Sequence, residues 1–393
     1  MLYTIQEKCL LLQILMLFIF PYPVQNLNKI SKIIVILFGI LSVVVVLIYL
    51  YKDFKIYKSI FLIFLFQSII FLSLMFANNI PMMDFFRGII PFLYYIYIPI
   101  FKKNPKIKTE IFLKILLLIS LCYSLRILFY WLIYCYNTNM RVTFFLSKAT
   151  SGIPLIGLLF SIYVLILKKR LIYAFITLMI FFSIIITETK GMLLSSVIGF
   201  TGLYFSLTMG KLKKIKFILI ILTLFATLFF TDFSRRYRNI IDLNVLITKN
   251  EIYTNDKGSI DIRLTEIKKI LTHFRESPLL GKGMGFKWDS EEIYGNKVLY
   301  SHNFIAYILL NFGIIGIVYL FVIIFYILKI LKKLKKERII KFYFSVMLTM
   351  FIYSNIFAYY RQIECSLILS MIIGFYIKKY EEILFVGEKI ERI

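Results

Sequence analysis

The stretch FIAYILLNFGIIGIVYLFVIIFYIL, residues Phe304–Leu328, contains no charged side chain over its 25 positions. An α-helix needs about 20 predominantly apolar residues to cross the hydrocarbon core of a bilayer. A helix on the surface of a soluble domain would instead show polar residues along one face. This stretch therefore predicts a membrane-spanning helix, and it sets the scale for the rest of the chain.

Eleven further apolar runs precede or follow it. Together they predict an all-α, polytopic membrane protein with about twelve transmembrane helices, organised as a single membrane domain over residues 1–393. The runs are Cys9–Leu27, Ile33–Leu50, Ser59–Phe76, Phe85–Phe101, Ile111–Tyr136, Gly152–Leu167, Leu171–Ile186, Met192–Thr208, Ile215–Phe230, Phe342–Tyr360 and Cys365–Ile377.

Composition supports the membrane class. The chain is 60% hydrophobic, whereas soluble domains usually contain about 45–50% apolar residues. Its formal net charge is +26, which in a soluble protein would suggest nucleic-acid binding. The four cysteines lie within or beside apolar runs, without the spacing of a metal site or of a disulfide framework.

The placement of the basic residues explains the charge and orients the chain. With the N-terminus inside, alternate short segments between the runs collect most of the basic residues, as positively charged cytoplasmic loops do. The short segments on the opposite side hold only Lys29, Lys32, Arg87, Arg141, Lys148, Lys190 and Arg361. This pattern predicts a multi-pass protein of the cytoplasmic (inner) membrane with both termini cytoplasmic, and no role in nucleic-acid binding. The basic segments hold Lys52, Lys55 and Lys58; Lys102, Lys103, Lys106 and Lys108; Lys168, Lys169 and Arg170; Lys211, Lys213, Lys214 and Lys216; the cluster from Lys329 to Lys341; and Lys378, Lys379, Lys389 and Arg392.

One long polar segment, residues 232–301, lies between the ninth and tenth predicted helices. This orientation places it on the extracytoplasmic side of the membrane. Long loops that are not disordered usually carry function. Leu264, Ile267, Leu271 and Phe274 recur at helical spacing, which predicts a short amphipathic helix over 260–275 on or near the membrane surface. The glycine-rich residues 281–285 predict a flexible turn.

The chain has two histidines, His273 and His302. His273 falls on the predicted loop helix, where a solvated or packed side chain is expected. His302 stands where the outer loop meets the tenth helix. It could simply cap that helix, or it could act as a general base, since a neutral imidazole is suited to that task near pH 7.

Three motifs in order resemble those of the bacterial O-antigen ligase and O-antigen polymerase superfamily. The first is Arg263 followed four residues later by Ile267, and the second is the turn PLLGKG at 278–283. The third is His302-Asn303, nine residues, Gly313, two residues and Gly316. The resemblance covers 184–320 in sequence, and the remaining chain resembles the family in its topology.

The resemblance implies a glycosyltransferase that takes glycan from an undecaprenyl-diphosphate carrier at the outer face of the membrane. It implies an inverting enzyme that needs no metal and no cofactor. Its partners would be the lipid-linked oligosaccharide donor, a glycan acceptor and the lipid bilayer, with a chain-length regulator protein as a candidate partner.

The same resemblance, with the chemistry of the residues, assigns the site. His302 would deprotonate the acceptor hydroxyl, and Arg263 would stabilise the departing diphosphate. Lys190, Arg126 and Asn303 are expected to contact the diphosphate or other parts of the substrate.

Two of these assignments have competing explanations. The family usually has Ser-Arg-Gly where this chain has Thr189-Lys190-Gly191, and lysine keeps the charge but loses the planar fork of arginine. Lys190 could therefore be an ordinary interfacial lysine. Arg126 falls in the middle of an apolar run, where a charge usually faces a partner or a cavity, although it could also extend to the membrane surface.

Within this class the chain is predicted to be a repeat-unit polymerase for a surface polysaccharide such as O-antigen or capsule. A ligase that passes the glycan to lipid A-core is the alternative. A lipid-linked oligosaccharide flippase is the rival from another class. Transporters usually build midplane sites from inverted repeats and broken helices, whereas this chain concentrates its external polar groups in one asymmetric loop.

Overall fold

The computed structural model describes residues 5, 7–13, 37, 39–48, 74–103, 109–135, 151–187, 189–207, 259–291, 295 and 297–390. Within these ranges every regular element is a helix, and one isolated antiparallel bridge joins Trp288 to Val298. The all-α prediction is confirmed for this part of the chain. The elements are α3 (Met82–Leu93), η2 (Tyr94–Ile96), α4 (Tyr97–Lys103), α5 (Thr109–Tyr130), η3 (Trp131–Cys135), α7 (Ile153–Lys168), α8 (Leu171–Ile186), α9 (Lys190–Leu207), α13 (Ser259–Glu276), α15 (Phe304–Lys333), α16 (Arg338–Ile356), η5 (Tyr359–Arg361) and α17 (Ile363–Ile390).

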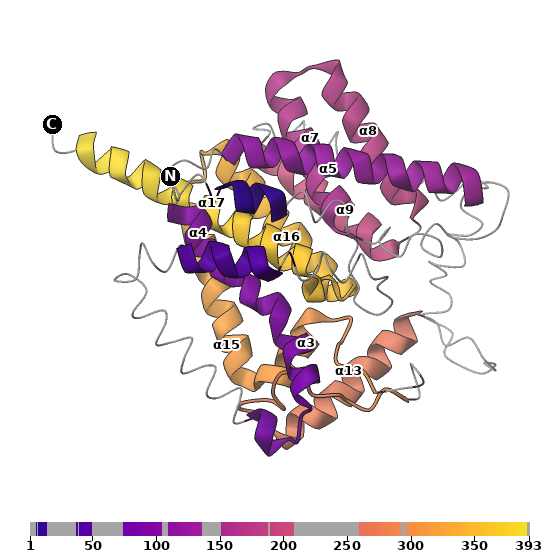
Figure 1. Ribbon diagram of the computed structural model, residues 1–393. Coiled ribbons are helices and arrows are strands. Elements are labelled where there is room, and N and C mark those ends of the chain that lie inside the picture. The colour runs from indigo at the N-terminus through magenta and orange to yellow at the C-terminus, as the bar shows by residue number, and fades with distance from the viewer. Residues whose placement is uncertain are drawn as a thin grey trace.

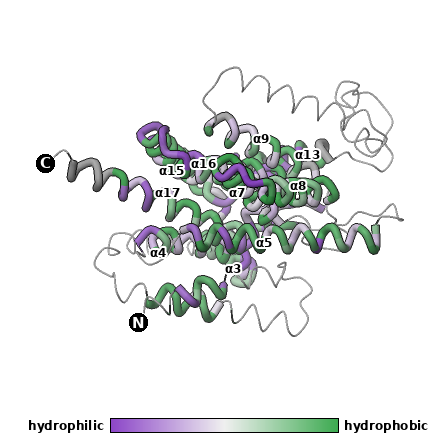
Figure 2. Tube along the Cα trace, turned by 90° about the horizontal axis from the view of Figure 1, so that it is seen from above, coloured by the Kyte–Doolittle hydropathy of each residue, from purple (hydrophilic) through white to green (hydrophobic). Residues whose placement is uncertain are grey.

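Four helical segments are long and apolar enough to cross a membrane: Met82–Lys103, Thr109–Cys135, Phe304–Lys333 and Arg338–Ile356. Shorter apolar helices cover Gly39–Ile48, Ile153–Lys168, Leu171–Ile186 and Gly191–Tyr204. Figure 2 shows most of the described helices in the hydrophobic colour, with a hydrophilic turn between α15 and α16. The total of about twelve stays a prediction, because the ninth run, Ile215–Phe230, lies outside the described residues.

The helices pack around one large apolar core. α7 is buried over most of its length and lies between α5, α8, α9 and α16. Small residues permit these close approaches, as is usual between membrane helices: Gly157 lies directly against Ser120, and Gly199 lies directly against Thr349.

The bundle has two chemically different ends. At one of them, the lysine-rich end, the Lys102 ammonium lies 2.6 Å from Glu381, and Lys341 donates to the Ser206 carbonyl at 2.6 Å. The first contact joins the end of α4 to the C-terminal half of α17, and the second joins the start of α16 to the end of α9.

The opposite end is built around the turn η5, and is called the η5 end below. Gly191 at the start of α9 packs on Ile356 at the end of α16, and Gly152 before α7 packs on Tyr359. The Ile305 amide at the start of α15 donates to Asn355. The described helices thus place Lys102, Lys341 and the start of α15 at the ends that the charge alternation predicts, with the two lysines opposite the start of α15.

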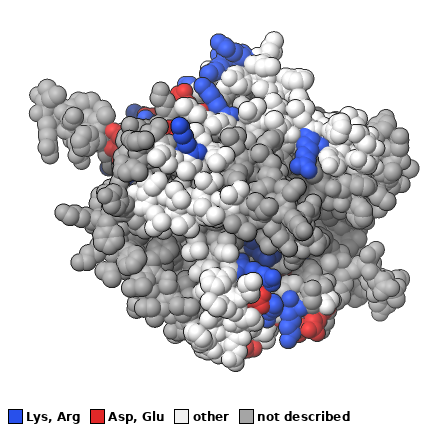
Figure 3. Space-filling view, viewed as in Figure 1, with Lys and Arg blue, Asp and Glu red and all other residues white. Residues whose placement is uncertain are grey.

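Charged side chains also lie on the surface of the molecule (Figure 3). In the view of Figure 1, the turn between α7 and α8 lies at the top and α13 lies low. In Figure 3 positive side chains stand at the top, with some negative ones beside them at the upper left, and positive and negative side chains also stand together near α13. Carboxylates therefore accompany the cations of α13.

The amphipathic helix predicted over 260–275 is present as α13, one residue longer at each end. Leu264 and Leu271 of the predicted apolar stripe are 48% and 38% exposed, and the place of the helix at the membrane surface stays a prediction. The face that packs centres on Ile270, which is fully buried with Trp288 and Leu310. α13 turns this face, and not Leu264 and Leu271, toward α15 and toward the loop that connects α13 to α15.

Candidate functional site

The backbone of α15 is broken at Gly313, which has φ 60° and ψ −152°. This conformation is open almost only to glycine. The break frees amides and carbonyls of the helix, and the turn at 278–283 takes them up. The amides of Lys282 and Gly283 donate to the carbonyls of Leu310 and Asn311 at 2.7 and 3.1 Å, while the Ile314 and Ile315 amides donate to the carbonyls of Pro278 and Leu279 at 2.8 and 3.3 Å.

This exchange explains why two separate glycine motifs occur in one chain. A Cβ on Gly313 would lie 2.5 Å from the Pro278 and Leu279 carbonyl oxygens, and one on Gly281 would lie 2.5 Å from the Asn311 carbonyl carbon. The turn predicted at 281–285 is present, and its glycines let two backbones come into contact; its flexibility stays a prediction. Lys282 adds an ion pair of 2.6 Å to Glu276, which ties the turn to the end of α13.

Asn303 and His302 have different places at the start of α15. The Asn303 side-chain oxygen accepts a hydrogen bond from the Ala306 amide at 2.9 Å, so Asn303 is the N-cap. The cap role considered for His302 therefore belongs to its neighbour. Substrate binding by Asn303 stays a prediction.

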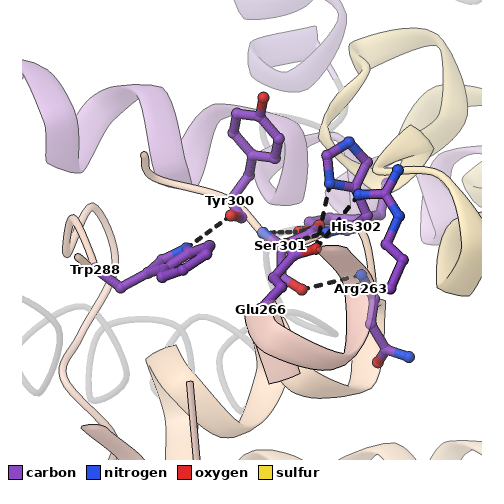
Figure 4. A network of polar contacts seen from close by, with 8 residues as sticks. Arg263, Glu266, Trp288, Tyr300, Ser301 and His302 are labelled. Atoms are coloured by element: carbon purple, nitrogen blue, oxygen red, sulfur yellow. Dashed lines mark hydrogen bonds and ion pairs between the residues drawn. The ribbon is translucent and has the colours of Figure 1, made fainter. Parts of the chain in front are cut away.

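Glu266 joins α13 to the histidine. Its Oε1 accepts a hydrogen bond from the His302 amide at 2.7 Å, and its Oε2 lies 3.4 Å from His302 Nδ1. The same Oε2 lies 3.3 Å from Arg263 Nη1. Figure 4 shows the three side chains converging, with Glu266 between the other two. The structure thus brings together Arg263 and His302, the two residues to which the sequence assigns catalysis.

The Glu266 carboxylate is held in its ionised form. Its side chain is only 1% exposed, and burial raises the pKa of such a carboxyl. The hydrogen bonds from His302 and the electrostatic attraction of His302 and Arg263 outweigh burial, so that the pKa of Glu266 lies below its usual value. An ionised carboxylate on Nδ1 favours the tautomer that makes Nε2 the basic ring nitrogen.

Aromatic side chains surround the imidazole. The Tyr300 ring centroid lies 5.3 Å from that of His302. The centroid of Phe357, the residue directly after α16, lies 6.4 Å from that of His302. Tyr360 fastens the segment from η5: its hydroxyl donates to the Ser301 carbonyl at 2.7 Å and accepts from the Ser301 amide at 3.3 Å. His302 is therefore held by α13 and by η5 together.

Comparison with known families agrees with this geometry. Residues 174–321 match the family model described as O-antigen ligase. The matched segment contains α9, α13, the glycine turn and the histidine. The match supports the resemblance of this chain to the O-antigen ligase and polymerase superfamily. The matched segment spans less than half of the chain. No curated protein matches the chain.

The other sequence-predicted site residues, Lys190 and Arg126, lie on helices other than α13. Lys190 is the first residue of α9 in the O-antigen ligase segment, and its backbone lies at the η5 end because Gly191 packs on Ile356. Arg126 lies on α5, outside that segment, with its guanidinium 5.7 Å from the Tyr130 ring. Among the described residues no contact joins Arg126 to Glu266.

His273, as expected, is a packed residue of α13. Its ring lies edge-on to Phe286 with 5.3 Å between centroids, and its Nδ1 is 3.7 Å from Glu276. It takes no part in the group formed by Glu266, Arg263 and His302.

Sequence reasoning missed Glu266. A signal was available, because Glu266 lies three residues after Arg263 on a predicted helix, where side chains share a face. Its link to His302 depends on how α13 docks on α15, which no local pattern specifies.

Proposed function

We propose that this protein is a metal-independent, inverting membrane glycosyltransferase that transfers glycan from an undecaprenyl-diphosphate carrier. The observation that carries the proposal is the contact of Glu266 with both His302 and Arg263, within the segment that matches the O-antigen ligase family. An imidazole oriented by a buried carboxylate is the arrangement of a general base. The nearby guanidinium suits a leaving group that carries negative charge.

The proposed step is a single displacement at the anomeric carbon. The acceptor hydroxyl gives its proton to Nε2 of His302 as its oxygen forms the new glycosidic bond. The bond between the anomeric carbon and the diphosphate oxygen breaks on the opposite face, which inverts the configuration. The electron pair of that bond leaves with undecaprenyl diphosphate, and Arg263 stabilises the growing charge.

Three further residues belong to the proposed substrate site. Lys190 at the start of α9 and Arg126 on α5 would contact the diphosphate, and Asn303 would contact the substrate beside its capping role. Support for Lys190 is the position of its backbone at the η5 end. Support for Arg126 is its place within an apolar span, where a charge needs a partner.

The η5 end would face outward, since the lysine-rich end has the composition of a cytoplasmic surface. The protein would then lie in the cytoplasmic membrane with both termini inside. We favour a repeat-unit polymerase for a surface polysaccharide, with a ligase as the second candidate; a chain-length regulator protein as partner stays a prediction. The family match and the carboxylate–histidine pair favour an enzyme over a flippase.

The test is chain extension by the purified protein supplied with undecaprenyl-diphosphate-linked repeat units. His302→Ala should lower the rate by about 10²–10⁴-fold, the usual contribution of a general base. His302→Gln should behave alike, because it cannot accept the proton. His273→Ala is the matched control and should keep nearly full activity.

Undiminished extension by His302→Ala would refute the proposed base. Loss of wild-type extension upon addition of a chelator would refute the metal-free mechanism. Products that reach a lipid A-core acceptor without growing in length would identify the ligase.

A further inference from the structure

Arg361 is the last residue of η5 and stands beside the catalytic histidine proposed above. Its guanidinium carbon lies 4.1 Å from the centroid of the Tyr300 ring. The same ring lies 5.3 Å from the ring of His302. The guanidinium and the imidazole therefore flank one tyrosine, although Arg361 lies outside the sequence motifs and outside the segment that matches the family.

The turn that carries Arg361 is firmly held. The Tyr360 hydroxyl makes two hydrogen bonds with the backbone of Ser301, and its ring packs on Tyr307 with 4.7 Å between centroids. Tyr359 is fully buried and fills the space against Gly152. Arg361 is thus presented by a preorganised turn, as a binding residue must be if little entropy is to be lost on binding.

The charge of Arg361 is not compensated as that of Arg263 is. Arg263 pairs with Glu266, whereas no carboxylate within the described ranges lies at ion-pair distance from Arg361. The nearest acidic residue in sequence, Glu364, instead accepts a hydrogen bond from Ser151 at 2.7 Å. Arg361 is partly buried, and a cation without an anion in such a place is costly unless a ligand provides one.

We propose that Arg361 binds the diphosphate group of the lipid-linked donor, with Tyr300 holding its guanidinium in place. The inference rests on the proposed function. A guanidinium can donate two parallel hydrogen bonds to phosphate oxygens, and stacking on Tyr300 leaves the edge of its planar fork available for them. Arg361 would then bind the ground-state donor, while Arg263, already paired with Glu266, responds to the charge that develops on transfer.

The test measures binding of undecaprenyl diphosphate to the full-length protein in detergent, by the rise in melting temperature as the lipid is added. Arg361→Gln should weaken the apparent Kd about 10- to 100-fold, the usual loss for hydrogen bonds to a charged group. Arg361→Lys should recover part of the affinity, because it restores the charge without the fork. Tyr300→Leu should weaken binding less than Arg361→Gln does.

Arg87→Gln is the matched control, since Arg87 is 62% exposed and pairs with Asp84 on α3. Its Kd should equal that of the wild type. Equal Kd values for Arg361→Gln and wild type, or equal weakening by Arg361→Gln and Arg87→Gln, would overturn the proposal. Chain extension by the wild type that depends on His302 would meanwhile leave the proposed function standing, whereas a wild type that neither extends chains nor binds the lipid would overturn both.

Discussion

Glu266 shows how a single buried carboxylate can assemble a site from distant segments. It accepts the His302 amide and lies beside both the His302 imidazole and the Arg263 guanidinium. Removal of its charge weakens the contacts to the His302 amide, the His302 imidazole and the Arg263 guanidinium together, and such a loss costs more than the net value of one contact.

Glu266→Gln keeps the shape of the side chain and removes its charge. At pH 7 we expect it to lower the free energy of unfolding by about 1–3 kcal/mol. The pKa of Glu266 is lower in the folded protein than its ordinary value of 4.5. Its contribution is therefore complete above that value and is lost as the pH falls through the folded pKa.

Melting temperatures measured in detergent should accordingly converge as the pH falls below about 4.5. Glu291→Gln, at an exposed position of the same loop, should change neither the melting temperature nor its pH dependence. A gap between Glu266→Gln and wild type that stays constant down to strongly acidic pH would contradict the assigned charge. Chain extension should also fall, because the imidazole loses its orienting partner.

The sequence named Arg263 and His302, which stand in motifs, as candidate site residues, and it missed Glu266, which packing brings to both. Arg263 and His302 were predictable from residue type, order and the resemblance. Glu266 was not, because its contacts depend on docking α13 against α15. A local hydrophobic periodicity predicts a helix, but it does not specify how that helix docks on another.

At the scale of elements, the decisive feature is the broken helix α15. Hydropathy predicted one continuous span from Phe304, and it placed the start of the helix correctly. The break at Gly313 is invisible to a hydropathy window, because glycine is ordinary in membrane helices. Similarly, the run predicted over Phe342–Tyr360 is α16 up to Ile356 followed by η5, since Phe357 turns to an extended conformation.

Gly313→Ala tests the break. The added Cβ would meet two carbonyl oxygens at 2.5 Å, and alanine strongly disfavours φ 60° with ψ −152°. We expect a loss of about 3 kcal/mol or more in the free energy of unfolding, from backbone strain of about 1–3 kcal/mol together with the clash. Gly202→Ala on α9 is the control: a Cβ added there would have no atom within 4 Å, so alanine should be neutral or stabilising by up to about 1 kcal/mol.

The two glycine variants should also separate in function. If Gly313→Ala is folded at low temperature, its chain extension should be impaired, because the turn at 278–283 loses its hydrogen bonds to α15 and α13 shifts with it. A melting temperature for Gly313→Ala equal to that of Gly202→Ala would show that α15 is continuous at this point.

For the whole molecule, the alternation of basic segments predicted which helix ends lie together, and the described helices agree. Lys102, Lys341 and Lys333 make their contacts, with Glu381, Ser206 and Tyr380, at the lysine-rich end, and the histidine stands at the other. The sequence could not give the tilt or the contacts of these helices, because a uniformly apolar span such as α7 has no face that identifies its neighbour.

The direction in which the two ends face is open to a labelling experiment on intact cells. Lys297 lies in the loop before His302, and Lys335 lies in the turn between α15 and α16; both are exposed. A cysteine at 297 should react with a membrane-impermeant thiol reagent from outside, and one at 335 should react only after the membrane is permeabilised. The four native cysteines are buried or partly buried, so the unaltered chain sets the background. The reverse pattern would place His302 on the cytoplasmic face, where a glycan already carried across the membrane could not reach it, and the glycosyltransferase proposal would fail while the helical fold remained.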